Sequence, residues 1–361
     1  MKILIISQCY FPTKSPRANR TTQLACELVR QGHDVTVMLP DLNEEFYRIC
    51  TQQTGVKFKN LGDQRFKRSK SQYLIVRIAM RLLQLLFEFP DVQLVWLIKK
   101  ALKHESGYDM LITIAVPHPN HWGVAASIKR NKNLCSTWVA DCGDPYMNCK
   151  TDTFNKLFHF KYVEKNWCKK CDFIVVPEAS SIDGYYPKFH SKIKIIPQGF
   201  ALGEVTLKPY SGNKVPTFGY AGGLALHFRN PIPLLDFLCS LDFDFKFIVY
   251  TECDILDNHI KKLKGKLEVR SYISRLELLP ILSQMNFLIN FDNNTSVQTP
   301  SKLIDYALVN RPVLAIGNKL NETDVLQFLN GDYTNKMVLP DINKYDIKKI
   351  AKQFTDLSKQ A

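Results

Sequence analysis

The apolar residues of the first 200 positions fall into short continuous runs. These runs cover residues 2–7, 34–39, 109–115, 137–140, 173–176 and 192–196, and they are typical of strands that are buried on both faces of a sheet. Stretches with a helical period lie between them, beginning with residues 20–30. Gly32 is expected to end this helix, because glycine readily adopts the left-handed conformation that follows many helices. Strands that alternate with helices predict right-handed βαβ units and a parallel sheet.

The same alternation restarts after residues 201–214, a polar and turn-rich stretch. Strands are predicted at residues 217–221, 245–250, 267–272, 287–291 and 312–316, with helices that begin at Pro231 and Ser301. The last stretch, residues 344–358, is amphipathic and helical in its pattern.

We therefore predict an α/β protein with two doubly wound, Rossmann-like domains. The first spans residues 1–200 and the second residues 215–342, with residues 201–214 as the linker. The C-terminal segment, residues 343–361, is expected to form a helix that packs back towards the first domain. We expect a ligand in the cleft between the domains, at the carboxyl ends of the strands.

Composition narrows the class of protein. The chain has 361 residues, of which 45% are hydrophobic and 23% charged, and these values exclude a disordered or collagen-like chain. The N-terminus is too weakly apolar for a secretion signal, and no segment reaches the roughly 18 apolar residues of a spanning helix. The ten scattered cysteines indicate free thiols in a reducing cytoplasm. Cys168 and Cys171 are interpreted as packing residues, because a zinc site needs two more ligands at matching spacing.

The charge changes the picture more. The chain has 48 Lys and Arg residues against 34 Asp and Glu residues, a net charge of +14, which favours an anionic partner. Residues 57–104 carry 11 basic and 3 acidic residues, a net charge of +8. Within them, residues 74–89 form an apolar helical pattern with Arg77 and Arg81, which fits a helix lying on anionic lipid. A solvated basic loop followed by two core-packing helices is the alternative. No nucleic-acid partner is expected, because no recognition motif occurs.

Residues 298–317, QTPSKLIDYALVNRPVLAIG, carry the first phosphate-binding signal, although neither GxGxxG nor GxxxxGK[ST] occurs in the chain. Ser301 begins a predicted helix, whose free N–H groups and positive dipole end suit a phosphate, and Lys302 adds a cation there. Asp305 is placed to accept two hydrogen bonds from a diol such as ribose. The alternative is that Asp305 only stabilises the N-terminal half of the helix.

Residues 219–229, GYAGGLALHFR, carry the second signal. Gly222 and Gly223 follow a predicted strand and let the backbone approach a ligand closely. Arg229 lies just beyond them, ahead of the next predicted helix. Taken alone, an ordinary strand-to-helix turn would look the same.

Together with the first half, these stretches resemble glycosyltransferase family 4, of the bacterial polysaccharide-biosynthesis type, which has the GT-B fold. QCYFPTKSPRANRTTQLACELVRQGHDVTVML looks like the family's opening strand, acceptor loop, first helix and second strand. VPHPNHWGVAASIKR followed by STWVADCGDPY is similar to its PHxxH and D-x-x-D-P-[WY] segments. IKIIPQGF, RSYISRLELLPILSQMNFLINF and PSKLIDYALVNRPVLA resemble three later segments in the same order. Each motif is weak alone, but their order over nearly the whole chain is specific for fold and class.

The resemblance implies transfer of a sugar, with retention of configuration, from a nucleoside-diphosphate sugar to a lipid-linked glycan. No metal or other cofactor is expected. It implies donor-binding roles for Gly222, Gly223, Arg270, Tyr272, Ser301 and Asp305, acceptor-binding roles for Arg17, Arg20 and Asp144, and catalytic roles for His118, Arg229 and Lys302. His118 would hydrogen-bond the transferred sugar, unless it is only a structural residue at a helix start, as we expect for His121. Asp141 and Asp144 contact sugar or brace a loop.

The chain also departs from the family pattern. Val297 stands where the first glutamate of the family's E-x7-E pair would be, and Asp305 replaces the second with a carboxylate one methylene shorter. The arginine of the family's Gly-Arg pair is missing at Gly223, so Arg229 is the nearest cation. We expect Arg229, Lys302 and the helix start to neutralise the donor diphosphate; a weakened donor site is the alternative.

Two other functions stay open at this stage. One is a GT-B-type nucleotide-sugar epimerase, which the scarcity of histidines and carboxylates in the expected cleft disfavours. The other is a non-catalytic glycosyltransferase-like subunit, which the missing glutamate and arginine favour. The expected place of action is the inner membrane face, where a peripheral enzyme would build capsule or O-antigen polysaccharide.

Overall fold

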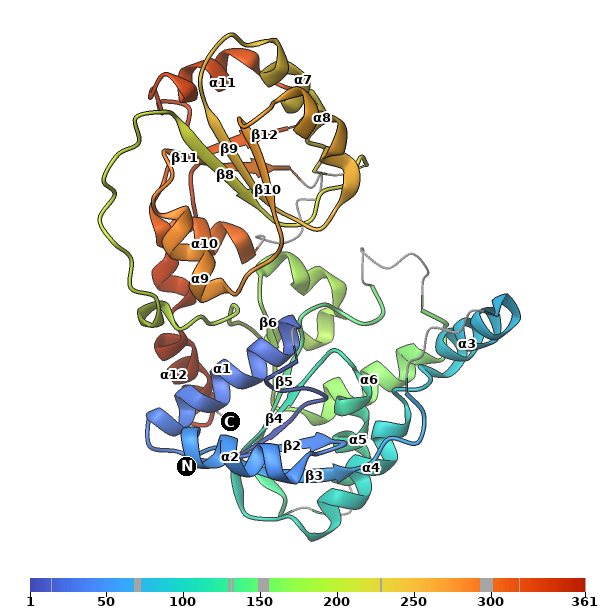
Figure 1. The fold of residues 1–361 in the computed structure, drawn as a ribbon. Helices are drawn as coiled ribbons and strands as arrows, with labels where there is room; N and C mark the ends of the chain where they lie inside the picture. The colour runs from blue at the N-terminus through green and yellow to red at the C-terminus, as the bar shows by residue number, and fades with distance from the viewer. Residues whose placement is uncertain are drawn as a thin grey trace. The chain divides into compact units, whose positions relative to one another are not determined.

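The computed structural model describes residues 1–13, 15–67, 73–128, 131, 133–148, 156–227, 229–292, 301–317 and 319–360. These residues form two units, Met1–Ala201 with Lys344–Ala361, and Leu202–Asn343. Each unit is a parallel β-sheet covered by helices (Figure 1). The predicted α/β fold with two Rossmann-like domains is confirmed. Val297 and residues 68–70 of the basic stretch lie outside the described residues.

The first unit contains a seven-stranded sheet in the order β3-β2-β1-β4-β5-β6-β7. Its strands are β1 (Lys2–Ile6), β2 (Asp34–Pro40), β3 (Lys57–Gly62), β4 (Tyr108–Ile114), β5 (Cys135–Asp141), β6 (Phe173–Val176) and β7 (Ile193–Ile195). Its helices are α1 (Pro16–Arg30), α2 (Glu44–Thr54), α3 (Leu74–Phe87), α4 (Gln93–Ala101), α5 (Pro119–Ile128), α6 (Phe160–Lys170) and α12 (Ile347–Leu357). All strand pairs are parallel, so the carboxyl ends of β1, β4 and β5 meet at one edge.

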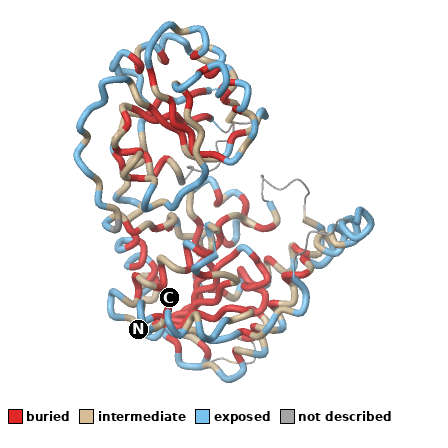
Figure 2. Tube along the Cα trace, viewed as in Figure 1, coloured by how far each residue is buried: buried red, intermediate tan, exposed pale blue. Residues whose placement is uncertain are grey.

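Successive side chains of the central strands enter different cores, as the two-residue period of a strand requires. In β1, Ile3 and Ile5 belong to the core beneath α1 and α12, whereas Leu4 and Ile6 belong to the core beneath α4, α5 and α6. Figure 2 shows this burial as continuous red along the strands. The sheet is therefore covered on both faces, which explains the unbroken apolar runs in the sequence.

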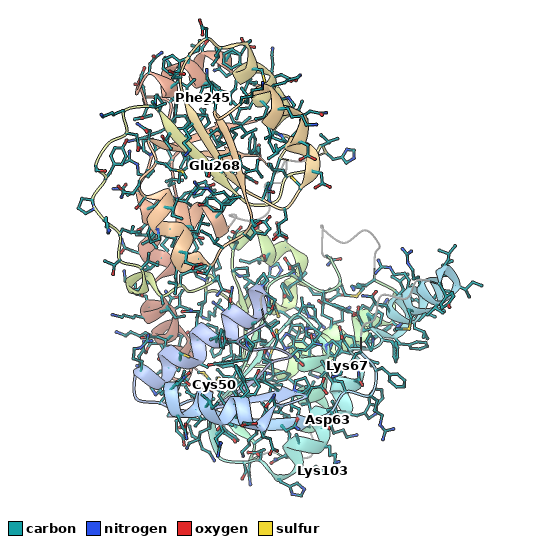
Figure 3. The ribbon with its side chains drawn as sticks, in the orientation of Figure 1. Cys50, Asp63, Lys67, Lys103, Phe245 and Glu268 are labelled. Carbon is teal, nitrogen blue, oxygen red and sulfur yellow. The ribbon has the colours of Figure 1, made fainter. Side chains whose placement is uncertain are left out.

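The second unit contains a five-stranded parallel sheet in the order β10-β9-β8-β11-β12. Its strands are β8 (Thr217–Ala221), β9 (Lys246–Tyr250), β10 (Leu267–Arg270), β11 (Phe287–Phe291) and β12 (Val313–Ile316). Its helices are α7 (Ile232–Ser240), α8 (Asp257–Lys262), α9 (Arg275–Leu282), α10 (Ser301–Val309) and α11 (Glu322–Leu329). Stacked phenylalanine rings link neighbouring strands: the Phe218 ring lies 4.6 Å from both Phe247 and Phe287. Phe245, labelled in Figure 3, adds to this cluster.

Helix α12 belongs to the first unit although it follows the second in sequence. Its start is held by two backbone hydrogen bonds, Phe200 N to Tyr345 O at 2.7 Å and Ile347 N to Phe200 O at 3.0 Å. Its apolar face, with Ile350 and Phe354 fully buried, packs on the core beneath α1. The chain thus crosses to the second unit and returns, so α12 completes the first core.

Phe354→Ala should test how much α12 contributes to the first unit. The ring is fully buried, so its removal is expected to lower the free energy of unfolding by about 3–5 kcal/mol. Urea denaturation followed by circular dichroism measures the change. Lys352→Ala, on the exposed side of the same helix, is the control and should change stability by less than about 0.5 kcal/mol. Equal effects of the two substitutions would contradict the packing role.

Candidate functional site

Two glycines end β8 in the second unit. Gly222 has a φ of 145°, which side-chain-bearing residues rarely adopt, and its N–H donates to the Tyr250 carbonyl at 3.0 Å. The Tyr220 hydroxyl donates to the Gly223 carbonyl at 2.8 Å. These contacts fix the turn so that its backbone lies next to the buried Tyr220 side chain.

Lys302 and Arg229 lie beside this turn. The Lys302 ammonium is 4.8 Å from the centre of the Tyr220 ring, and its Nζ is buried without a hydrogen-bond acceptor among the described residues. Burial, and then the nearby Arg229 charge, lower the pKa of Lys302 to about 7, although Asp292 opposes this shift. Burial raises the pKa of Tyr220 to about 12 against the effect of Arg229. The two predicted cations therefore share one site with Gly222 and Gly223, a site that suits a polyanion.

Asp305 lies on the same helix as Lys302, but it is already held by a cation. The Arg275 Nε donates to Asp305 Oδ1 at 2.7 Å. Burial raises the pKa of Asp305, and Arg275 partly offsets the shift. Arg275 was not predicted from the sequence. Arg275 therefore orients the carboxylate of Asp305, the residue that we predict to bind a diol.

The remaining donor-site predictions are placed as follows. Arg270 ends β10, where its guanidinium donates to Glu268 at 2.7 Å and to the Tyr250 hydroxyl at 2.9 Å; Figure 3 labels Glu268. Its carbonyl accepts the Thr251 N–H, so Arg270 mainly braces the strand ends. Tyr272 is half exposed. Its hydroxyl lies close to Gly223, 4.0 Å from the point where a Cβ would be if position 223 had a side chain. Ser301 is the first residue of α10.

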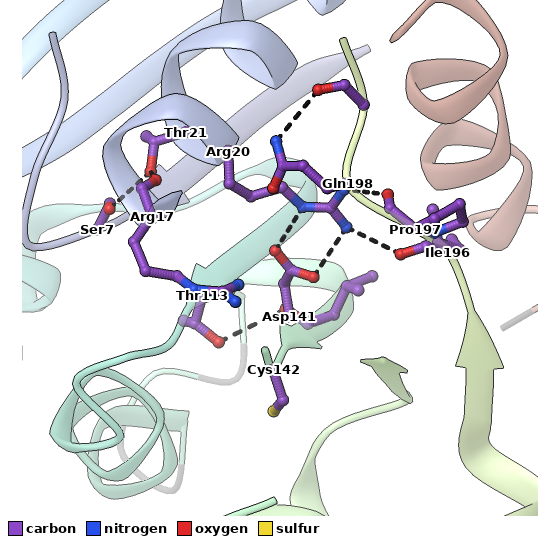
Figure 4. A network of polar contacts seen from close by, with 12 residues as sticks. Ser7, Arg17, Arg20, Thr21, Thr113, Asp141, Cys142, Ile196, Pro197 and Gln198 are labelled. Atoms are coloured by element: carbon purple, nitrogen blue, oxygen red, sulfur yellow. Dashed lines mark hydrogen bonds and ion pairs between the residues drawn. The ribbon is translucent and has the colours of Figure 1, made fainter. Parts of the chain in front are cut away.

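In the first unit, Arg20 is buried and fully engaged (Figure 4). Its Nε and Nη2 donate to the two carboxylate oxygens of Asp141 at 2.9 and 3.0 Å, and its other N–H groups donate to the carbonyls of Ile196 and Pro197. The prediction that Arg20 binds an acceptor stays a prediction, although in this structure Asp141 neutralises its charge and its N–H groups donate within the first unit. Both carboxylate oxygens of Asp141 accept hydrogen bonds from Arg20, so Asp141 also stabilises the fold.

Arg17 differs from Arg20, one turn away on α1. Ser15 caps the helix through its side chain, and Pro16 occupies the first turn, so α1 begins one turn earlier than predicted and brings Arg17 to the sheet edge. The Arg17 guanidinium fills the space that a side chain at position 143 would occupy, so only Gly143 allows this contact. Asp144 follows at a half-buried position.

His118 lies at the start of α5, within the electrostatic reach of Arg17. Its ring is buried, and its Nδ1 has no hydrogen-bond partner among the described residues. Burial, the neighbouring His121, Lys156 and Arg17 all lower the pKa of His118 well below its usual range. The ring is therefore neutral near pH 7 and suits a hydrogen bond rather than strong general-base catalysis.

His121 is a structural residue by its contacts. Its Nδ1 is 2.7 Å from Thr113 Oγ1, its Nε2 is 3.3 Å from the Cys142 sulfur, and burial lowers its pKa to about 3. Cys168 and Cys171 are also buried, in the core beneath α6, as their interpretation as packing residues requires.

Some residues at these sites were not found by sequence reasoning. Tyr220, Gly143 and Lys156 each lie beside a predicted residue. Tyr220 and Gly143 lie within the sequence motifs described above. Their closeness in sequence to predicted site residues could therefore have identified them. Arg275 and Asp305 join α9 to α10 although they lie 30 residues apart in sequence, and no local pattern predicts such a pair.

The two units, with their seven- and five-stranded parallel sheets, define a two-domain Rossmann-like fold of the GT-B class. Solved structures similar to this chain include the lipopolysaccharide outer core galactosyltransferase WaaB, with a TM-score of 0.61, 11% identity and 100% of both chains covered. Anabaena HepE, solved in complex with UDP and glucose, has a TM-score of 0.60, 11% identity and the same coverage. The UDP-GlcNAc 2-epimerase of Neisseria meningitidis, bound to UDP-GlcNAc, has a TM-score of 0.59, 10% identity and also covers both chains fully. No family model and no curated protein matches the chain.

Lys302→Met is expected to stabilise the ligand-free protein. Folding lowers the pKa of Lys302 to about 7, so between pH 7 and about 10 the lysine is protonated in the unfolded protein and largely neutral in the folded protein. Below pH 7 it is charged in both states, and the burial of its charge then lowers the free energy of unfolding most. The substitution should raise the free energy of unfolding of the second unit by on the order of 2 kcal/mol at pH 6, with a smaller gain at pH 10. Scanning calorimetry at both pH values measures this. Destabilisation at pH 6 would show that the ammonium is well solvated.

Proposed function

We propose that the protein is a retaining glycosyltransferase of family 4 type that uses a nucleoside-diphosphate sugar. The observation that supports this most is the buried, unsatisfied Lys302 ammonium next to Arg229 at the Gly222–Gly223 turn. Burying the Lys302 ammonium beside a second cation is unfavourable without a ligand, and a bound diphosphate would offset that cost. HepE, of similar fold, is described in complex with UDP and glucose.

In this proposal, the bond between the anomeric carbon and the diphosphate oxygen breaks, and the acceptor oxygen bonds to that carbon. The departing nucleoside diphosphate thereby gains negative charge. Arg229 and Lys302 stabilise that charge, with the N-terminal end of α10, and electrostatic stabilisation of this kind is often the largest catalytic contribution. These side chains would supply the positive charge without a metal ion. The leaving phosphate takes the acceptor's proton, and neutral His118 donates or accepts a hydrogen bond at the sugar. Asp305, oriented by Arg275, holds the ribose diol.

Binding of nucleoside diphosphates tests the donor site. We expect titration calorimetry with UDP, GDP and ADP to detect one preferred nucleotide. Lys302→Met and Arg229→Met should each weaken it by about tenfold to a hundredfold, because each removes a charged hydrogen-bond donor. Lys319→Met, at an exposed position in the same unit, is the matched control and should bind normally. No binding by the wild-type protein would favour a non-catalytic subunit.

Transfer itself needs a second assay. Mass spectrometry after incubation with a panel of nucleotide sugars and a lipid-linked acceptor should show the acceptor gaining one sugar. The similar fold of an epimerase makes donor epimerisation without acceptor the result that would replace this proposal. His118→Ala should lower the transfer rate and leave UDP affinity unchanged.

We further propose that α3 places the enzyme on an anionic membrane surface, where its lipid-linked acceptor would lie. None of the residues of α3 is buried, and Figure 1 shows the helix projecting from the sheet of the first unit. Its exposed apolar residues are Leu74, Ile75, Val76, Ile78, Leu82, Leu83, Leu86 and Phe87. A core-packing role for this helix, the alternative raised by the sequence, does not fit this exposure. No helix among the described residues has the length and apolarity to cross a membrane.

The basic charge of residues 57–104 is less concentrated than the sequence implies. Lys57, Lys59 and Lys67 form ion pairs with Asp34, Glu105 and Asp41. Figure 3 shows Lys103 far from α3. In this proposal we therefore assign the lipid-facing charge first to the arginines of α3 itself, Arg77 and Arg81.

Flotation with vesicles that contain 30% phosphatidylglycerol tests this contact. The wild-type protein should float with the vesicles at low salt and less at high salt. Arg77→Glu together with Arg81→Glu should weaken vesicle binding more than tenfold, at about 1 kcal/mol for each basic charge near the surface. Lys103→Glu together with Lys348→Glu, the same charge change at two exposed positions outside α3, is the control. Equal loss in both proteins would show attraction by net charge alone.

A further inference from the structure

Glu88 ends α3 and is buried, although the helix itself is exposed. Its φ of 55° lies in the left-handed region, which turns the chain sharply after Phe87. The residue is 9% exposed, whereas Phe87 before it is 57% exposed. Glu88 therefore attaches one end of an otherwise exposed helix to the first unit.

The Glu88 carboxylate has two donors from a different part of the chain. Its Oε1 accepts hydrogen bonds from the Tyr146 hydroxyl at 2.9 Å and from the Lys156 ammonium at 2.7 Å. The Lys156 ammonium also lies 4.8 Å from the centre of the Tyr146 ring. A second attachment lies nearby, where His159 Nε2 bonds to the Leu86 carbonyl at 3.1 Å. The last turn of α3 is thus joined to the segments around residues 146 and 156–159.

Tyr146 carries this attachment to His118. The two rings lie 4.8 Å apart, and Trp122 and Phe160 contact the Tyr146 ring edge-on at 5.5 Å. The next residue, Met147, donates its N–H to the buried Glu164 at 3.3 Å. Packing therefore holds the tyrosine ring, while Glu88 accepts a hydrogen bond from its hydroxyl.

We propose that Glu88 is a positioning residue that couples α3 to His118 through Tyr146. The inference rests on the proposed contact of α3 with lipid. When α3 lies on an anionic surface, the Glu88 carboxylate samples fewer positions, and the Tyr146 ring that forms the wall of the His118 site becomes more ordered. Because such coupling is reciprocal, a ligand bound at His118 would also tighten the contact of α3 with the surface.

Hydrogen exchange of the full-length protein, with and without vesicles that contain 30% phosphatidylglycerol, tests the coupling. In the wild-type protein, vesicles should slow exchange in α3 and, by about fivefold, in peptides that cover residues 115–121 and 142–148. In Glu88→Gln, vesicles should still protect α3, but the other two peptides should no longer respond. Tyr146→Phe, which keeps the ring and removes the hydroxyl, should reproduce this uncoupling. Glu45→Gln, at an exposed position of α2, should behave as wild type.

The outcomes separate the two proposals. Protection of α3 without a response near His118, or an equal response in Glu88→Gln, overturns the coupling and leaves the lipid contact standing. If vesicles do not slow hydrogen exchange in α3, the lipid contact is overturned. Hydrogen exchange measured without vesicles then tests whether Glu88 positions the His118 site. In that case Glu88→Gln should exchange at residues 115–121 at least fivefold faster than Glu45→Gln. Equal exchange would overturn the role of Glu88 altogether.

Discussion

The buried ion pair of Arg20 and Asp141 is the interaction on which the first unit depends. It joins α1 to the end of β5 and, through two carbonyls, to Ile196 and Pro197, where the chain leaves the sheet. The Phe354 ring of α12 lies 5.1 Å from the same guanidinium. Removing either charge would leave the other buried without a partner, which is strongly destabilising. The pair therefore fixes the helix that carries Arg17 and, with it, the surroundings of His118.

The second unit follows the opposite principle. Among the described residues, the Lys302 ammonium has no hydrogen-bond acceptor of the kind that Asp141 provides for Arg20, and burial and Arg229 disfavour its charge against the attraction of Asp292. The nearby Asp305 carboxylate is paired with Arg275 instead. One unit thus uses its buried cation to stabilise the fold, whereas the other keeps a cation in a state that an incoming anion would relieve.

The sequence predicted most strands because buried parallel strands are continuously apolar. The predictions at 173–176, 217–221 and 287–291 coincide with β6, β8 and β11. Strand β3 was missed because it is an edge strand in which Leu61 is the buried residue, so no apolar run marks it. Helix α2 was missed as well; it exposes most of its residues and buries Cys50.

The candidate site was predictable only in part, for a related reason. Glycines after a strand and a lysine at a helix start are local signals, so Gly222, Gly223 and Lys302 could be proposed. Whether an arginine is available or is used internally depends on partners far along the chain. Arg17 and Arg20 are indistinguishable in sequence, yet Asp141 engages only Arg20, 121 residues away.

The contact between Arg17 and Gly143 has a consequence for how such proteins diverge. Any side chain at position 143 would push the guanidinium aside, and this displacement moves a charge without opening the core, since Arg17 is long and flexible. The two positions should therefore change together during evolution. A relative that has lost the glycine would place its positive charge elsewhere on the sheet edge.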